Sequence, residues 1–202
     1  MKNFSLLKTL NIADLITLLG LIPLILSFHF IIIDKSFHAI ITICVAFIFD
    51  ILDGYIARKL NISSALGRQL DSFLDSFNYL ILTCFFIYTF LNFNTQLTFL
   101  IIFITLTGGV LRLARHNLTG FNKKNNSLYY TGLIVPYTQF AVITIFFTTI
   151  HISEDTIYLL LPILLIISLL MISDFKIKKV KNYTFTFLII ILLIILSITN
   201  IV

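Results

Sequence analysis

The chain has 202 residues, of which 59% are hydrophobic and 11% are charged, and its formal net charge is +5. Soluble domains carry about a quarter charged residues, so this composition excludes an ordinary soluble protein and favours a polytopic membrane protein. We expect one domain over residues 1–202, because no linker-like stretch or internal repeat divides the chain. The positive charge requires no nucleic acid as a partner, since contact with the anionic headgroups of a lipid bilayer explains it.

Seven apolar segments approach or exceed the length of about 20 residues that a membrane-spanning helix needs. In chain order they are Asp14–Ile33, His38–Arg58, Ala65–Phe93, Gln96–Arg115, Leu128–Ile150, Thr156–Phe175 and Thr184–Val202. The expected fold class is therefore all-α, a polytopic bundle of membrane helices. Pro23, Pro136 and Pro162 fall inside these segments, where membrane helices tolerate a kink. The last segment has few capping signals, which leaves open whether it belongs to the core.

The basic residues predict an orientation. If the N-terminus lies in the cytoplasm, only Lys35 of the 14 Lys and Arg residues falls outside, together with Asp34, Glu154 and Asp155. The basic residues placed inside are Lys2, Lys8, Arg58, Lys59, Arg68, Arg112, Arg115, Lys123, Lys124, Lys176, Lys178, Lys179 and Lys181. This is a positive-inside pattern. We expect a multi-pass protein of the cell membrane with a cytoplasmic N-terminus.

Four aspartates lie close to the turn between the second and third segments, two on each side: Asp50, Asp53, Asp71 and Asp75. Spacings of three and four residues place the members of each pair on one helix face. A short turn follows the second segment, with Ser63 or Ser64 as the N-cap of the next helix. Such a helical hairpin would bring the four carboxylates together at the cytoplasmic boundary of the membrane.

Clustered acids in apolar surroundings repel one another unless a cation neutralises them, and acids inside a membrane are functional candidates. Carboxylate oxygens suit hard divalent cations, and the absence of Cys and His from the stretch argues against zinc. We therefore expect two divalent ions, Mg²⁺ or Mn²⁺, as cofactors. The metal ligands predicted from this cluster are Asp50, Asp53, Asp71 and Asp75.

Small residues and one arginine accompany the acids. Gly54 follows Asp53 inside a helix, where a missing side chain lets a bulky ligand approach the backbone. Ala57 keeps the same face small, and Arg58 offers a fork of donors suited to phosphate. Gly67 opens a second gap at the start of the third segment. Acids, small residues and arginine together indicate a site for a nucleotide diphosphate.

The complete pattern, Asp50-x2-Asp53-Gly54-x2-Ala57-Arg58-x8-Gly67-x3-Asp71-x3-Asp75, resembles the signature of the CDP-alcohol phosphatidyltransferases. The resemblance implies a six-helix core, here with one extra span, in a membrane homodimer whose active site faces the cytoplasm. It implies transfer of a phosphatidyl group from a CDP-linked lipid to a small polar alcohol, with release of CMP. Asp75 is implied to be the general base. The residues implied to bind the CDP-lipid are Asp50, Asp53, Gly54, Ala57, Arg58, Gly67 and Asp71.

A second resemblance concerns the acceptor alcohol. The segment RLARHN (Arg112–Asn117) is similar to the RLARFN-type segment of the phosphatidylserine synthases within this family, including archaeal relatives that use ether lipids. Arg112 and Arg115 are thus expected to bind the acceptor, L-serine, through its carboxylate. The segment SFNYLILT (Ser76–Thr83) departs from that subfamily, so inositol phosphate and glycerol phosphate remain alternative acceptors.

Two hypotheses from other classes also fit an acidic cluster in a membrane. An ion-coupled transporter would use intramembrane carboxylates, and a structural membrane protein could hold a stabilising metal. Neither needs the spacing of Gly54, Ala57, Arg58 and Gly67, so we favour the enzyme. CMP-dependent exchange of labelled lipid would distinguish it from both.

Overall fold

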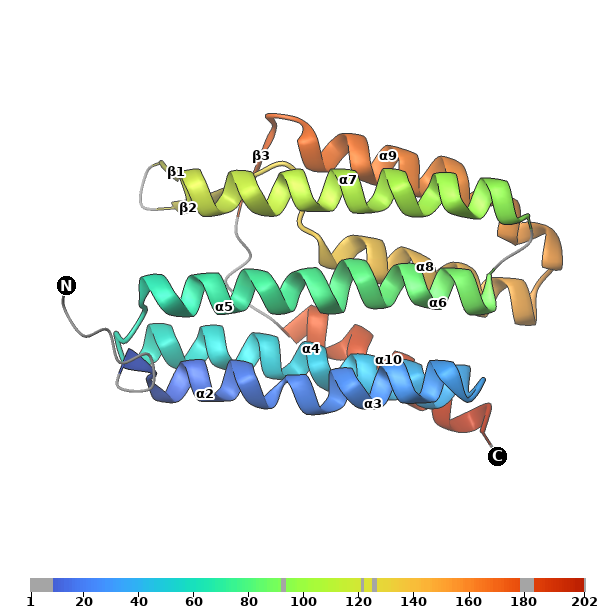
Figure 1. The fold of residues 1–202 in the computed structure, drawn as a ribbon, viewed down its shortest axis with the longest axis horizontal. Helices are drawn as coiled ribbons and strands as arrows, with labels where there is room; N and C mark the ends of the chain where they lie inside the picture. Colours follow the sequence, from blue (N-terminus) through green and yellow to red (C-terminus); the bar gives the residue numbers. More distant parts are fainter. Residues whose placement is uncertain (1–8, 92–93, 121, 125–126, 179–183, 202) are drawn as a thin grey trace, which may run out of the picture.

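The computed structural model describes residues 9–91, 94–120, 122–124, 127–178 and 184–201. Over these ranges the chain forms a bundle of helices that run along one long axis (Figure 1), which confirms the all-α membrane bundle. The α-helices are α2 (Ile12–Leu19), α3 (Leu21–Ile32), α4 (Ser36–Lys59), α5 (Ala65–Asp75), α6 (Thr83–Phe90), α7 (Thr95–Thr119), α8 (Pro136–His151), α9 (Leu160–Ile172) and α10 (Thr184–Thr199). A π-helix, η1 (Ser76–Leu82), joins α5 to α6, and a 3-10 helix, η2 (Glu154–Leu159), leads into α9.

Five helical stretches of the described chain are long and apolar enough to cross a membrane, which makes the protein multi-pass. They are Ile12–Ile32, Ser36–Lys59, Ala65–Phe90, Thr95–Thr119 and Glu154–Ile172. Helices α8 and α10 are apolar but have only 16 residues each. The last one, α10, packs against α4 and buries Ile190 and Leu193, so this segment is part of the bundle.

The expected span Leu128–Ile150 was wrong at its beginning. Residues 127–131 form a β-strand, and helix α8 begins only at Pro136. Proline suits the first position of a helix because its missing N–H would have no intrahelical partner there. Pro136 therefore starts a helix and does not kink one. Pro23 and Pro162 do lie inside spans, in the first turn of α3 and in the first turn of α9 respectively.

A small antiparallel sheet, which the sequence did not predict, lies beside the bundle. Its strands are β1 (Asn122–Lys124), β2 (Ser127–Thr131) and β3 (Lys176–Lys178), in the order β1-β2-β3. Tyr130 of β2 pairs with Ile177 of β3. The sheet therefore joins the segment after α7 to the segment after α9.

The turn between α4 and α5 forms as expected. Ser64 is the N-cap of α5, and its Oγ accepts a hydrogen bond of 2.8 Å from the backbone N–H of Gly67. Asn61 adopts a φ of 56°, a left-handed conformation that Asn tolerates better than most residues. Cys44 and Cys84 are buried free thiols in the core.

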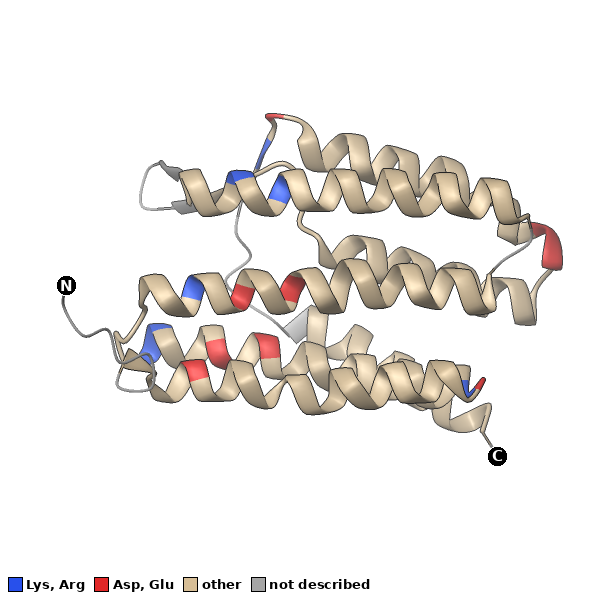
Figure 2. Ribbon diagram, in the orientation of Figure 1, with Lys and Arg blue, Asp and Glu red and all other residues tan. Residues whose placement is uncertain are grey.

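Charged residues gather at the two ends of the bundle (Figure 2). The Lys and Arg residues of α4, α5, α7 and β3 lie toward one end, whereas the turn before α4 and helix η2 carry acidic residues at the other end. Four of the expected inside residues lie outside the described chain, namely Lys2, Lys8, Lys179 and Lys181. The separation of charge agrees with a positive-inside arrangement, while the cytoplasmic side itself stays a prediction.

Candidate active site

Three of the four signature aspartates form a compact cluster. Asp53 lies six residues before the end of α4 at Lys59, and Asp71 lies six residues after the start of α5 at Ala65. Because the two helices are antiparallel across a short turn, residues equally far from that turn lie at the same depth. Asp50, Asp53 and Asp71 each offer one carboxylate oxygen, and these oxygens lie within 4.8 Å of one another.

Asp75 lies one turn further along α5, beside this cluster. Its carboxyl group is within hydrogen-bonding reach of Asp50. It also lines the same pocket as Asp50 and Asp53. The hairpin therefore brings all four signature acids into one site, with Asp75 at its deeper edge.

Two hydroxyl groups that sequence reasoning missed hold the carboxylates in place. Thr17 Oγ1 of α2 donates a hydrogen bond of 2.5 Å to Asp53 Oδ2. Tyr79 Oη of η1 donates one of 2.8 Å to Asp50 Oδ2. Each donor engages one oxygen of its aspartate and so orients the carboxylate, as hydrogen bonds to metal-binding side chains do. Tyr79 has a sequence signal, because it lies four residues after Asp75, but Thr17 has none.

The π-helix η1 begins directly after Asp75. A π-turn leaves backbone carbonyl groups without their usual i+4 partners, and such turns are frequent at functional sites. Helix α8 compensates here, since Gln139 Nε2 donates a hydrogen bond of 2.8 Å to the carbonyl oxygen of Asn78. The hydroxyl group of Thr138 lies 3.1 Å from the carbonyl oxygen of Tyr79. Buried side chains of α8 thus support the backbone that carries Tyr79 to the acids.

A small pocket, partly open to solvent, adjoins the cluster. Its lining is acidic on one side and otherwise largely apolar, with Leu24, Ala46 and Leu74 among its walls. Asn78 and Tyr79 add polar groups to the wall formed by η1. The enclosed space is small, so it suits a polar group placed against the acids.

The two signature glycines allow close approaches of neighbouring groups. A Cβ atom at Gly54 would lie 3.1 Å from Nη1 of Arg58, so the guanidinium group borders the space beside this glycine. A Cβ atom at Gly67 would lie only 2.5 Å from Oδ1 of Asp14. Asp14, a buried residue that sequence reasoning missed, forms a reciprocal capping box with Asn11 at the start of α2. Ala57 is partly buried on the same helix as Gly54 and Arg58.

Arg112 is a buried arginine close to Asp75. It is buried on α7, and its guanidinium group interacts electrostatically with the carboxylate of Asp75. Its Nε atom has no hydrogen-bond partner among the described residues. On the other side, the guanidinium carbon lies 5.8 Å from the centre of the Tyr130 ring. A buried cation with unused donor capacity is suited to an anionic group on a substrate.

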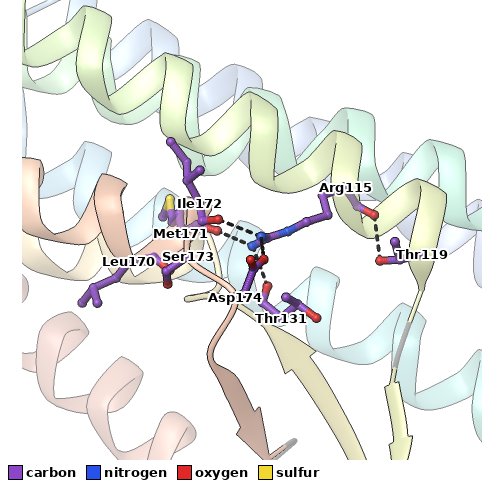
Figure 3. A network of polar contacts seen from close by, with 8 residues as sticks. All are labelled: Arg115, Thr119, Thr131, Leu170, Met171, Ile172, Ser173 and Asp174. Carbon is purple, nitrogen blue, oxygen red and sulfur yellow. Dashed lines mark hydrogen bonds and ion pairs between the residues drawn. The ribbon is translucent and has the colours of Figure 1, made fainter.

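Arg115 has a different set of partners (Figure 3). It points from α7 toward the end of α9, where Nη2 donates to the carbonyl oxygen of Met171 at 2.6 Å and Nη1 to that of Ile172 at 2.7 Å. It also donates to the carbonyl oxygen of Thr131 at 3.0 Å and forms an ion pair of 3.1 Å with Asp174. The structure thus gives Arg112 and Arg115 separate surroundings, although both were expected to bind the acceptor.

The family model described as CDP-alcohol phosphatidyltransferase matches residues 10–169, which is more than half of the chain. The chain belongs to the CDP-alcohol phosphatidyltransferase family. It is therefore an enzyme of this class, and family membership confirms the resemblance carried by the aspartates and small residues. With the enzyme class shown, the transporter and the purely structural membrane protein are no longer needed to explain the acids.

Three relatives within this family cover most or much of the chain. A CDP-diacylglycerol–serine O-phosphatidyltransferase of Methanocaldococcus jannaschii is 34% identical over 92% of this chain and 82% of that protein. A protein of the same description from Saccharomyces cerevisiae is 30% identical over 67% of this chain and 53% of that protein. An archaetidylserine synthase of Methanothermobacter thermautotrophicus is 26% identical over 90% of this chain and 76% of that protein.

The clustered carboxylates fit the divalent cations that CDP-alcohol phosphatidyltransferases use. Three oxygen donors within 4.8 Å of one another form a donor set that suits Mg²⁺, Mn²⁺ or Ca²⁺ better than a softer metal. The hydroxyl groups of Tyr79 and Thr17 each donate to Oδ2, of Asp50 and Asp53 respectively, and so orient these carboxylates within the cluster.

Proposed function

We propose that this enzyme transfers the phosphatidyl group of CDP-diacylglycerol, or of the corresponding CDP-ether lipid, to the hydroxyl group of L-serine and releases CMP. The observation that carries the choice of serine is the buried guanidinium group of Arg112 opposite Asp75. It offers a cation for the serine carboxylate at the place where a base would meet the serine hydroxyl. The names of three relatives, which contain serine or archaetidylserine, support the same acceptor.

The nucleotide end of the donor is assigned to the part of the site nearer the helix ends. We assign the CDP pocket to Asp50, Asp53, Gly54, Ala57, Arg58, Gly67 and Asp71. Arg58 is exposed beside Gly54, where its planar fork of donors can meet a phosphate group of the CDP-lipid. The lipid chains would lie between helices, in contact with the bilayer.

The metal site is assigned to Asp50, Asp53 and Asp71, with Asp75 as a further ligand and two ions as the expected number. Bound divalent cations would supply charge neutralisation for the diphosphate and for the departing CMP. Thr17 and Tyr79 would keep the carboxylates oriented toward them.

We assign the role of general base to Asp75. The serine oxygen would form a new bond to the lipid-bearing phosphorus, and the bond from that phosphorus to the oxygen of CMP would break. The proton of the serine hydroxyl would pass to the carboxylate of Asp75, which lines the pocket beside Asp50. Arg112 would hold the serine carboxylate so that the hydroxyl points toward this base.

The site is assigned to the cytoplasmic side of the cell membrane, because the basic residues gather at the end of the bundle nearer the acids (Figure 2). Arg115 remains a candidate for acceptor binding, but its present partners favour a supporting role. The homodimer implied by the family resemblance also stays a prediction, and the mass of the purified protein in detergent would test it.

In the experiment, serine, inositol phosphate or glycerol phosphate is added separately to purified protein with CDP-diacylglycerol and Mn²⁺, and CMP release is measured. The proposal predicts release with serine. If serine gives no CMP above background and a phosphorylated acceptor does, the acceptor assignment is wrong and the reaction class stands. A stable lipid-linked protein trapped during turnover would contradict direct attack by serine.

A further inference from the structure

Tyr130 lies over one face of α7 at the site. Its ring centre is 5.8 Å from the guanidinium carbon of Arg112 and 6.1 Å from the ring centre of His116. Arg112 and His116 are four residues apart, so both lie on the same helix face. The tyrosine ring therefore packs across one turn of α7 and contacts both the guanidinium group of Arg112 and the ring of His116.

Strand β2 holds Tyr130 in this position, and Arg115 fixes the strand. The carbonyl oxygen of Thr131, the next residue, accepts a hydrogen bond of 3.0 Å from Arg115 Nη2. The same guanidinium group binds the last carbonyl oxygens of α9 at Met171 and Ile172, which lack partners within their own helix (Figure 3). Arg115 thus links α7, β2 and α9 at one point.

The residues that follow Tyr130 are also held in place by hydrogen bonds to the segment at the end of α9. The N–H of Gly132 donates to the carbonyl oxygen of Phe175 at 2.9 Å, and the N–H of Leu133 donates to that of Leu170 at 3.1 Å. Gly132 has a φ of 73°, and a Cβ atom there would collide with the carbonyl oxygen of Met171 and with Arg115. These contacts therefore fix the position of strand β2 beside the end of α9.

We propose that Tyr130 is a positioning residue, whose ring holds the guanidinium group of Arg112 toward Asp75 and thereby sets the affinity for the anionic group of the acceptor. The role rests on the proposed function in one respect, namely that the acceptor binds at Arg112. A cation over an aromatic face is stabilised more strongly where water is scarce. Arg112 is 5% exposed and its Nε has no partner among the described residues, so the ring contact restrains a guanidinium group that has one unused donor.

The test compares variants of the full-length protein in the CMP-release assay, with separate titrations of acceptor and CDP-lipid. Tyr130→Leu removes the aromatic face, and we expect the acceptor KM to rise about tenfold while the CDP-lipid KM stays within about twofold. Tyr130→Phe keeps the face and should restore the acceptor KM to near the wild-type value. The matched control is Tyr129→Leu, since the neighbouring side chain points to the opposite face of the strand. It should leave both KM values close to those of the wild type.

The outcomes separate this inference from the proposed function. If the wild type releases CMP only with a phosphorylated acceptor, the assignment of serine as the acceptor is wrong. The Tyr130 variants are then assayed with the phosphorylated acceptor. The inference is overturned if Tyr130→Leu leaves the acceptor KM unchanged, raises both KM values alike, or is matched by Tyr130→Phe. Tyr130→Val, which keeps the strand preference of the position, replaces the Leu variant if that protein does not accumulate.

Discussion

The phenol group of Tyr79 donates a hydrogen bond of 2.8 Å to Oδ2 of Asp50, so the π-helix after the fourth signature acid reaches back to the first one. Tyr79 is 1% exposed, and its ring packs edge-on against Phe47 at a centroid distance of 5.6 Å. The contact joins η1 to α4 at the depth of the acids. It indicates that buried residues of the bundle core help to orient the acid cluster.

Replacing Tyr79 by Phe tests this orientation. The ring and its packing remain, while Asp50 loses its hydroxyl donor, so we expect a fall of about 10- to 100-fold in metal affinity or activity. Titration of CMP release with Mn²⁺ measures the effect. The matched control is Tyr88→Phe, because Tyr88 is exposed on the outer surface of α6. An unchanged Mn²⁺ dependence in the Tyr79 variant would show that the hydrogen bond does not support the metal site.

The acids themselves give a sharper prediction. Asp50→Asn and Asp71→Asn should each abolish measurable CMP release and leave a folded protein, because an amide has the shape of a carboxylate but not its charge. Asp155→Asn at the opposite end of the bundle is the control and should keep full activity. Removal of divalent cations with a chelator should likewise stop turnover, and Mn²⁺ should restore it. Full activity in excess chelator would contradict the metal assignment.

Substitutions at Gly54 test the CDP pocket. A Cβ atom there meets Nη1 of Arg58, which is the mobile end of a long side chain, so Gly54→Ala should weaken CDP-lipid binding only slightly. Gly54→Val adds bulk that one side-chain movement cannot accommodate and should prevent binding. Competition by CDP against labelled CDP-lipid measures both variants. If the Val variant binds the CDP-lipid with unchanged affinity, Gly54 does not line the pocket.

Arg115 should matter for stability more than its ion pair suggests. Asp174 is 96% exposed, so Asp174→Asn should leave the unfolding temperature nearly unchanged. Arg115→Lys loses the planar fork that reaches three backbone carbonyl groups, and we expect a loss of about 2–3 kcal/mol in the free energy of unfolding. Thermal unfolding in detergent compares the two variants. Equal and small shifts would show that the carbonyl contacts contribute little.

Local sequence patterns predicted the hairpin because its features depend on neighbours in the chain. The spacings of Asp50, Asp53, Asp71 and Asp75 follow helix periodicity, and Ser64 is a side chain that caps helices well. The family pattern then linked these positions to one reaction class. Each of these predictions needed only one turn and two helices.

The parts that sequence reasoning missed depend on contacts between distant segments. Thr17 lies 36 residues from Asp53, and the carbonyl partners of Arg115 lie up to 57 residues away. A threonine in an apolar segment carries no mark of such a partner. Strand β2 was also missed, since Leu128–Ile150 is apolar enough to be taken for one long helix, and pairing with β1 and with the distant β3 selects the strand.

The central claim is that serine accepts the phosphatidyl group through its own hydroxyl oxygen. The most direct measurement supplies serine labelled with ¹⁸O in its hydroxyl group, together with CDP-diacylglycerol and Mn²⁺, and analyses the lipid product and CMP by mass spectrometry. Our account predicts one labelled phosphatidylserine for each CMP, because the serine oxygen forms the new bond to phosphorus. CMP release without labelled lipid, or a serine lipid without ¹⁸O, would contradict it.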